Sequence, residues 1–181
     1  MKKTLIIATV LTSMAFGAKA QIYEGLKTKL SFFSETKMEN IDAVNTSAKP
    51  LLNIKTGAFA MKAQQTEFKF KSSFMQEHYN ENYMESEKFP FATFIGKVNE
   101  TIDYTKDGVY QVTMTGKLSM HGVEQERTIK GTITVSKGEI ILDSKFEVKV
   151  ADHKIKVPSL YIEKIAEIIQ VTFHTEMTLK K

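Results

Sequence analysis

The chain has 181 residues, of which 42% are hydrophobic and none is cysteine. This length suits one domain with a substantial core. The absence of cysteine excludes a disulfide framework, a thiol nucleophile and a thiolate metal site.

The first segment, residues 1–20, has the layout of a secretory signal peptide that is cleaved on export. A basic start precedes an apolar run from Leu5 to Phe16, and the small residue Ala20 predicts the cleavage point. The run, about a dozen residues long, is short for a membrane-spanning helix. We therefore expect a periplasmic or secreted protein with one domain over residues 21–181.

The charge balance changes once this segment is removed. Three of the 25 basic residues lie in it, so the remaining chain has 22 basic and 21 acidic residues. A near-neutral domain gives no electrostatic support for a nucleic-acid partner.

The remainder of the chain is dominated by alternation of apolar and polar residues, which is typical of half-buried β-strands. In chain order, this pattern predicts strands over residues 26–34, 41–46, 51–54, 58–71, 91–100, 109–120, 128–135, 140–150 and 169–177.

The predicted strand over residues 58–71 changes phase along its length. Phe59 and Met61 are apolar at odd positions, whereas Phe68 and Phe70 are apolar at even positions. A β-bulge near residues 64–66 would explain the switch.

One helical segment interrupts the strands, within the stretch SSFMQEHYNENYMESEKFP. Ser73 followed three residues later by Gln76 is a capping-box pattern, and Pro90 ends the segment. A shorter helical turn is expected near residues 160–165.

About eight sequentially connected strands predict an all-β fold, either an antiparallel barrel or a sandwich. The interior of an eight-stranded barrel is just wide enough for side chains or for one slender ligand. The sequence leaves open whether this interior is hollow or filled.

Alternating strands behind a signal peptide also occur in membrane barrels, whose apolar face points outward to lipid. We disfavour this alternative because the polar face carries too many lysines for a narrow lumen and the chain has no tryptophan. These lysines are Lys97, Lys117, Lys130, Lys145 and Lys149. The apolar face is therefore expected to point inward, in a protein that does not span the membrane.

Three glycines, Gly96, Gly116 and Gly131, fall on this inward phase. Glycine inside a strand removes a side chain, which leaves space or lets another backbone approach closely. Relief of strain in coiled barrel strands is the competing explanation. We favour the interpretation that they shape an apolar cavity.

The hairpin GKLSMHGVEQERTIKG and the segment FMQEHYNENYMESEKFPFATFIG resemble conserved parts of the YceI-like family of polyisoprenoid-binding periplasmic proteins. The resemblance extends over most of the chain from about Leu26. It implies a lipocalin-like, eight-stranded antiparallel barrel with a short helix between strands. It also implies a ligand that is an isoprenoid, a quinone-like molecule or a fatty-acid derivative.

The chain offers no clear catalytic or metal-binding motif, so we expect neither an enzyme nor a metal site. No two of the four histidines have the short helical spacing of metal ligands, and no serine has a nucleophile-elbow context. His121 is expected to fix the turn before Gly122. His78 on the short helix could cap the barrel or contact a ligand headgroup, and Arg127 is a second headgroup candidate.

The sequence thus predicts a non-catalytic barrel that sequesters or carries a long-chain amphiphile, with no required cofactor. An envelope-stress or protein-interaction barrel with a filled core is the alternative, and a homodimer is left open. Besides His78 and Arg127, the residues expected to line the ligand tunnel are Phe68, Phe70, Phe94, Tyr110, Met114, Leu142, Phe146, Phe173 and Met177.

Overall fold

The structure is a computed structural model that describes residues 21–158 and 163–181. The predicted signal peptide and part of the predicted helical turn near residues 160–165 lie outside the described residues. The strands are β1 (Ile22–Glu35), β2 (Asn40–Asn45), β3 (Lys49–Asn53), β4 (Ala58–Gln64), β5 (Lys69–Phe70), β6 (Phe91–Val98), β7 (Gly108–Met120), β8 (Val123–Ser136), β9 (Glu139–Lys149) and β10 (Ile168–Leu179). The helical segments are η1 (Gln65–Glu67), α1 (Ser73–His78), the π-helical η2 (Tyr79–Tyr83) and η3 (Val150–His153).

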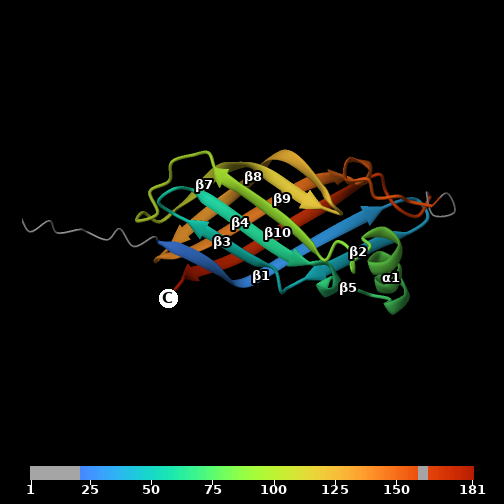
Figure 1. Ribbon diagram of the computed structural model, residues 1–181. Coiled ribbons are helices and arrows are strands. Elements are labelled where there is room, and N and C mark those ends of the chain that lie inside the picture. Colours follow the sequence, from blue (N-terminus) through green and yellow to red (C-terminus); the bar gives the residue numbers. More distant parts are fainter. Residues whose placement is uncertain (1–20, 159–162) are drawn as a thin grey trace, which may run out of the picture.

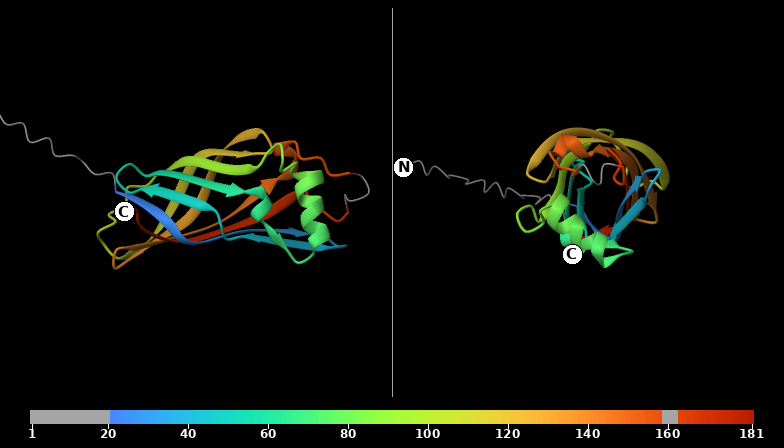
Figure 2. Two further views of the ribbon diagram at one scale, coloured as in Figure 1. Left: turned by 60° about the horizontal axis from the view of Figure 1, so that its bottom comes forward. Right: turned by 90° about the vertical axis from the view of Figure 1, so that its right-hand side faces the viewer.

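Eight of these strands close into an antiparallel barrel, which confirms the predicted fold class. The order is β10-β9-β8-β7-β6-β4-β3-β1, and β1 pairs in turn with β10 to complete the ring. The barrel is elongated, with α1 at one end and the end of β10 at the other (Figure 1). Seen from the α1 end, the strands are arranged in a ring (Figure 2).

The wall of the barrel is built differently near α1. The first part of β1 pairs with β3, whereas its second part pairs with β2, and β2 pairs with β5. In the sheet order β5 is an edge strand, and α1 and η2 follow it in the chain before β6 begins.

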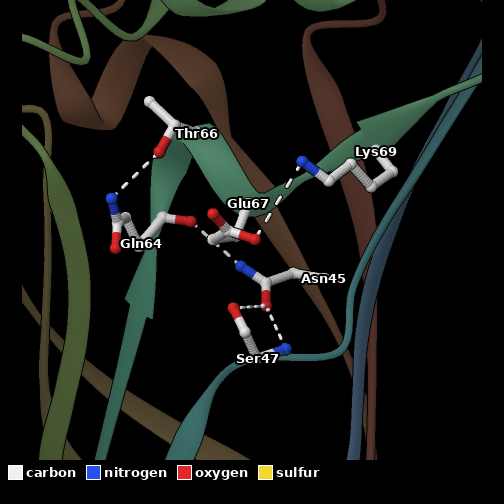
Figure 3. A network of polar contacts seen from close by, with 6 residues as sticks. All are labelled: Asn45, Ser47, Gln64, Thr66, Glu67 and Lys69. Atoms are coloured by element: carbon white, nitrogen blue, oxygen red, sulfur yellow. Dashed lines mark hydrogen bonds and ion pairs between the residues drawn. The ribbon is translucent and has the colours of Figure 1, made fainter.

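A polar corner forms where β2 leads to β3 and β4 leads to β5 (Figure 3). The buried Asn45 donates through Nδ2 to the carbonyl oxygen of Gln64 at 2.9 Å. Its Oδ1 accepts from the backbone N–H of Ser47 at 2.8 Å and from the Ser47 hydroxyl at 3.1 Å. This side chain supplies hydrogen bonds where strand pairing is interrupted.

The phase change predicted to be a β-bulge is instead produced by η1, a single 3₁₀ turn between β4 and β5. Before this turn Phe59 and Ala63 face inward, and after it Phe68 is again buried. The turn reverses the odd and even phases because it inserts residues that pair with no strand.

The helix begins at Ser73, one residue earlier than the predicted capping box implies, and this capping box does not form. Ser72 is the N-cap residue, and no side chain caps the first turn. The backbone N–H of Gln76 donates to the carbonyl oxygen of Ser72 at 3.1 Å. Backbone geometry therefore starts this helix.

The apolar phase of the barrel strands faces the interior, and the five lysines named above are exposed. This is the predicted orientation and the reverse of the membrane-barrel alternative. Among the described residues, no helix has the length and apolar character needed to cross a membrane.

The half of the barrel away from α1, here called the packed half, is filled by side chains. Phe59 lies with its ring centroid 6.2 Å from those of both Phe94 and Phe173. Ile133 and Leu142 in the same core are fully buried. A filled interior in this half leaves ligand space only nearer α1.

Candidate ligand-binding site

The half of the barrel next to α1, here called the hollow half, contains a cavity of about 280 Å³. This volume is near the lower end of the range for small-molecule sites, about 300–1,000 Å³. Its lining draws on β1, β2, β4, η1, β5, α1, η2, β6, β7, β9, η3 and β10.

Inward-facing apolar residues from the strands form one side of the cavity. Leu118 and Met120 come from the end of β7, and Phe146 and Val148 from the end of β9. They are spaced two apart because alternate residues of a strand face the same side. This part of the lining is apolar, as a hydrocarbon chain requires.

Four aromatic rings form a second part of the lining. The ring of Tyr79, from η2, lies 5.0 Å from Phe70, 5.5 Å from Phe32 and 5.8 Å from Phe68, measured between centroids. Such offset and tilted contacts hold the rings together by more than their buried area. The cluster ties the helical segment to β1 and β5.

One polar pair lies within this apolar lining. The Tyr79 hydroxyl donates to Oε1 of Gln65 at 2.6 Å, and Gln65 is only 1% exposed. Burial raises the pKa of the Tyr79 phenol well above its usual value, so the hydroxyl stays protonated and remains a donor.

Two charged lining residues, Glu39 and Lys164, are paired with each other. Their oxygen and nitrogen atoms are 4.0 Å apart, and both side chains stay partly exposed. Within the described residues, no group of three or more histidine or carboxylate side chains is arranged to hold a metal ion.

Four of the predicted ligand-binding residues line the cavity: Phe68, Phe70, Phe146 and His78. His78 projects from α1, where its ring centroid lies 4.1 Å from that of Phe74.

The other predicted tunnel residues lie outside the lining of this cavity. Those buried in the core of the packed half are Phe94, Met114, Leu142, Phe173 and Met177. Tyr110 is partly buried against this core, and its hydroxyl donates to the carbonyl oxygen of Lys106 at 3.1 Å. These residues have the predicted inward phase, but they lie too far from α1 along the barrel axis to reach the cavity.

Arg127 also differs from its prediction as a headgroup ligand. Its Nη2 lies 3.1 Å from Oδ2 of Asp152 in η3, and it is not part of the cavity lining. Arg127 is therefore already paired with a carboxylate of the same chain, on η3.

The three glycines predicted to shape a cavity lie at points of close backbone approach. Gly96 and Gly116 are paired across β6 and β7, and a Cβ built on Gly96 would lie 2.8 Å from the Gly116 Cα. A Cβ on Gly131 would lie 2.7 Å from the carbonyl oxygen of Asp143. None of the three lines the cavity. They allow close backbone approach, the alternative use of glycine inside a strand.

His121 fixes the turn between β7 and β8, as its position suggested. It has a φ of 52° and Gly122 a φ of 71°. Its Nδ1 lies 3.0 Å from the carbonyl oxygen of His153, and its Nε2 lies 2.8 Å from Oε2 of Glu85. The ring therefore links the turn to η3 and to the segment before β6.

Sequence reasoning missed Gln65, Tyr79 and Phe32 as lining residues. Gln65 falls where the strand phase breaks, and Tyr79 belongs to a helical segment whose inward face the alternation cannot reveal. Phe32 carried a usable signal, because it shares its phase with Leu30 on β1.

Comparison with known proteins places the chain among barrels of one type. A polyisoprenoid binding domain from Saccharophagus degradans implicated in plant cell wall breakdown has a TM-score of 0.76 and 13% identity, over 87% of this chain and 98% of that chain. Burkholderia cenocepacia BcnA has a TM-score of 0.69 and 16% identity, over 83% and 96% of the two chains. A Campylobacter jejuni YCEI protein has a TM-score of 0.59 and 19% identity, over 75% and 81%.

At these identities the structural likeness establishes the fold alone. A search of curated protein sequences found no significant match. The sequence itself matches the YceI-like domain over residues 10–177, which is most of the chain. The protein therefore belongs to the YceI-like domain family.

Proposed function

We propose that this protein is a non-catalytic carrier that holds the hydrocarbon chain of one long-chain amphiphile in the cavity of the hollow half. The observation that carries the proposal is the apolar cavity of about 280 Å³, bounded by aromatic and methionine side chains. Such side chains adapt to a flexible chain. The filled-barrel alternative is disfavoured because it describes only the packed half.

The ligand class we propose is an isoprenoid, a quinone-like molecule or a fatty-acid derivative. Family membership supports it, as does the polyisoprenoid-binding description of the Saccharophagus degradans domain. Burial of about ten CH₂ groups supplies roughly 8 kcal/mol before ordering costs, so a ligand held with micromolar affinity must bury a longer chain or gain polar contacts as well.

Native mass spectrometry of the protein purified from its host tests the carrier function. We expect a retained mass that matches one lipid in the wild type. In Val148→Phe we expect that mass to be lost, because a ring added to this lining residue fills the cavity. A bare polypeptide mass, together with no uptake of a fluorescent fatty probe, would contradict the proposal and favour an envelope-stress or protein-interaction role.

We further propose that residues 1–20 are removed on export, so that the carrier acts in the periplasm or outside the cell. The basic start, apolar run and small residues before Gln21 support this. The mass of the protein recovered from its host should correspond to a chain that starts at Gln21. A mass that includes the first 20 residues would contradict it.

A further inference from the structure

Among the described residues, Gln65, Arg127 and His153 each have a buried side-chain nitrogen without a hydrogen-bond partner, and of these three Gln65 lines the cavity. Gln65 is 1% exposed, and its buried Nε2 makes no hydrogen bond with any described residue. A buried N–H group without an acceptor is costly, and native proteins leave few such groups unpaired.

The orientation of this amide follows from its contact with Tyr79. The Tyr79 hydroxyl lies 2.6 Å from the Gln65 atom assigned as Oε1. That separation is ordinary for O–H···O and short for N–H···O. The hydroxyl therefore donates to the amide oxygen, and the amide nitrogen, which carries both N–H donors, is left to another partner.

The same side chain is held in place from its backbone. The Gln65 N–H donates to the carbonyl oxygen of Pro90 at 2.9 Å, which joins η1 to the residue before β6. Gln65 is thus fixed at its backbone by one segment and at its amide oxygen by another. The amide is therefore held in position beside the cavity, with N–H donors that lack an acceptor among the described residues.

The surroundings favour an uncharged acceptor. Among the described lining residues, the full charges Glu39 and Lys164 are paired with each other and partly exposed. A carboxylate or phosphate at Gln65 would lose its hydration and gain only a neutral amide. A carbonyl, ester, ether or hydroxyl oxygen loses much less on entering the cavity.

We propose that Gln65 Nε2 is the polar anchor of the site and that the ligand carries an uncharged hydrogen-bond acceptor that reaches it. The nitrogen is covered at present, so the ligand oxygen reaches it through a small shift of side chains. Met61 and Met84, both in the lining, have the unbranched side chains that adapt most readily to such a change. The anchor rests on the proposed carrier function, because it concerns the same cavity.

The test compares two probes of equal length, methyl undecyl ketone and tridecane, which differ in one oxygen. Their affinities are measured by displacement of a fluorescent fatty probe from the wild type and from Gln65→Met. The ratio of the tridecane Kd to the ketone Kd should fall about tenfold in the variant, because Met offers no donor. Tridecanoate should bind the wild type more weakly than the ketone does.

A second measurement does not depend on the variant folding. In nitrogen-labelled wild type, the side-chain NH₂ signals of Gln65 should shift when the ketone is added and stay in place with tridecane. Tyr79→Phe, which removes the hydroxyl that orients the amide, should reduce the same preference for the ketone.

Binding of both probes with an unchanged Kd ratio in Gln65→Met would overturn the anchor while leaving the carrier function intact. Unshifted NH₂ signals with bound ketone would do the same, since a buried water would then be the partner of Gln65. Tighter binding of tridecanoate than of the ketone would overturn the uncharged ligand class. Failure of the wild type to bind either probe would overturn both the anchor and the carrier function.

Discussion

In the packed half, Phe59 meets Phe94 and Phe173 across the barrel axis, and the interior is occupied by side chains. In the hollow half, the same strands surround a cavity of about 280 Å³. Both halves have the same alternation and the same inward phase. The composition of the strands is therefore not what separates them.

The difference lies in how the wall is completed. In the packed half, β3 and β4 bridge β1 and β6 with continuous pairing. In the hollow half, β5 is an edge strand, and α1 and η2 contribute to the cavity wall instead. The cavity therefore lies where helical segments, as well as paired strands, complete the wall.

Truncation of a large side chain should give the largest difference between the two halves, measured as the loss in the free energy of unfolding. Phe173→Ala should lower the free energy of unfolding by about 3–5 kcal/mol, because Phe173 is 3% exposed and its loss leaves a cavity. Phe146→Ala, on the neighbouring strand, should cost only about 1–2 kcal/mol, since its ring already borders empty space. Urea denaturation measures both, and equal losses would mean that the halves are packed alike.

The glycine pair gives the next largest effect. Gly116→Ala should lower the free energy of unfolding by about 2 kcal/mol, because the new Cβ would lie 2.5 Å from the Gly96 Cα. The affinity for a fatty probe should be unchanged. Lys130→Ala, an exposed position on β8, is the matched control and should change stability by less than about 0.5 kcal/mol. A stable Gly116→Ala with weakened binding would support the cavity-shaping role.

The sequence was sufficient for the fold class, the inward phase and part of the cavity wall. It was not sufficient to place a residue along the barrel axis. The alternation of strand residues shows which face of the sheet a residue takes, but it does not show which layer of the barrel interior that residue joins. Phe146 and Phe173 were therefore predicted as one tunnel, although they lie in different halves. The position of Gln65 depends on η1, and the pairing of Arg127 depends on η3. The positions of both segments are set by contacts distant in sequence.

Enlargement of a side chain should affect binding in one half and stability in the other. Val148→Phe should change the free energy of unfolding by less than about 1 kcal/mol, because the ring enters existing space, while the affinity for a fatty probe falls at least about tenfold. Val112→Phe in the packed half should cost about 1–3 kcal/mol and leave the affinity unchanged. The opposite pattern would assign the ligand to the packed half.

The smallest effect concerns pH and the closure of the hollow half by η3. His153 is fully buried, its Nδ1 lies 3.2 Å from the Val123 carbonyl oxygen, and burial holds its pKa below the ordinary value. Below about pH 6.5 the unfolded chain binds a proton at this histidine, whereas the folded chain binds it only at a lower pH. Acidification therefore favours unfolding. The free energy of unfolding should therefore be largest above that pH and decline as the pH falls toward the lowered pKa.

His153→Asn keeps a donor near the Nδ1 position and removes the titrating ring. Its free energy of unfolding should decline less steeply than that of the wild type between about pH 7.5 and 5.5, whatever the absolute loss at neutral pH. In the wild type, acid should first speed amide exchange at the β7–β8 turn, which η3 covers, and only later at Ile140 in the packed half. Parallel pH profiles of the two proteins, or simultaneous exchange at both sites, would show that the histidine does not couple acid to the hollow half.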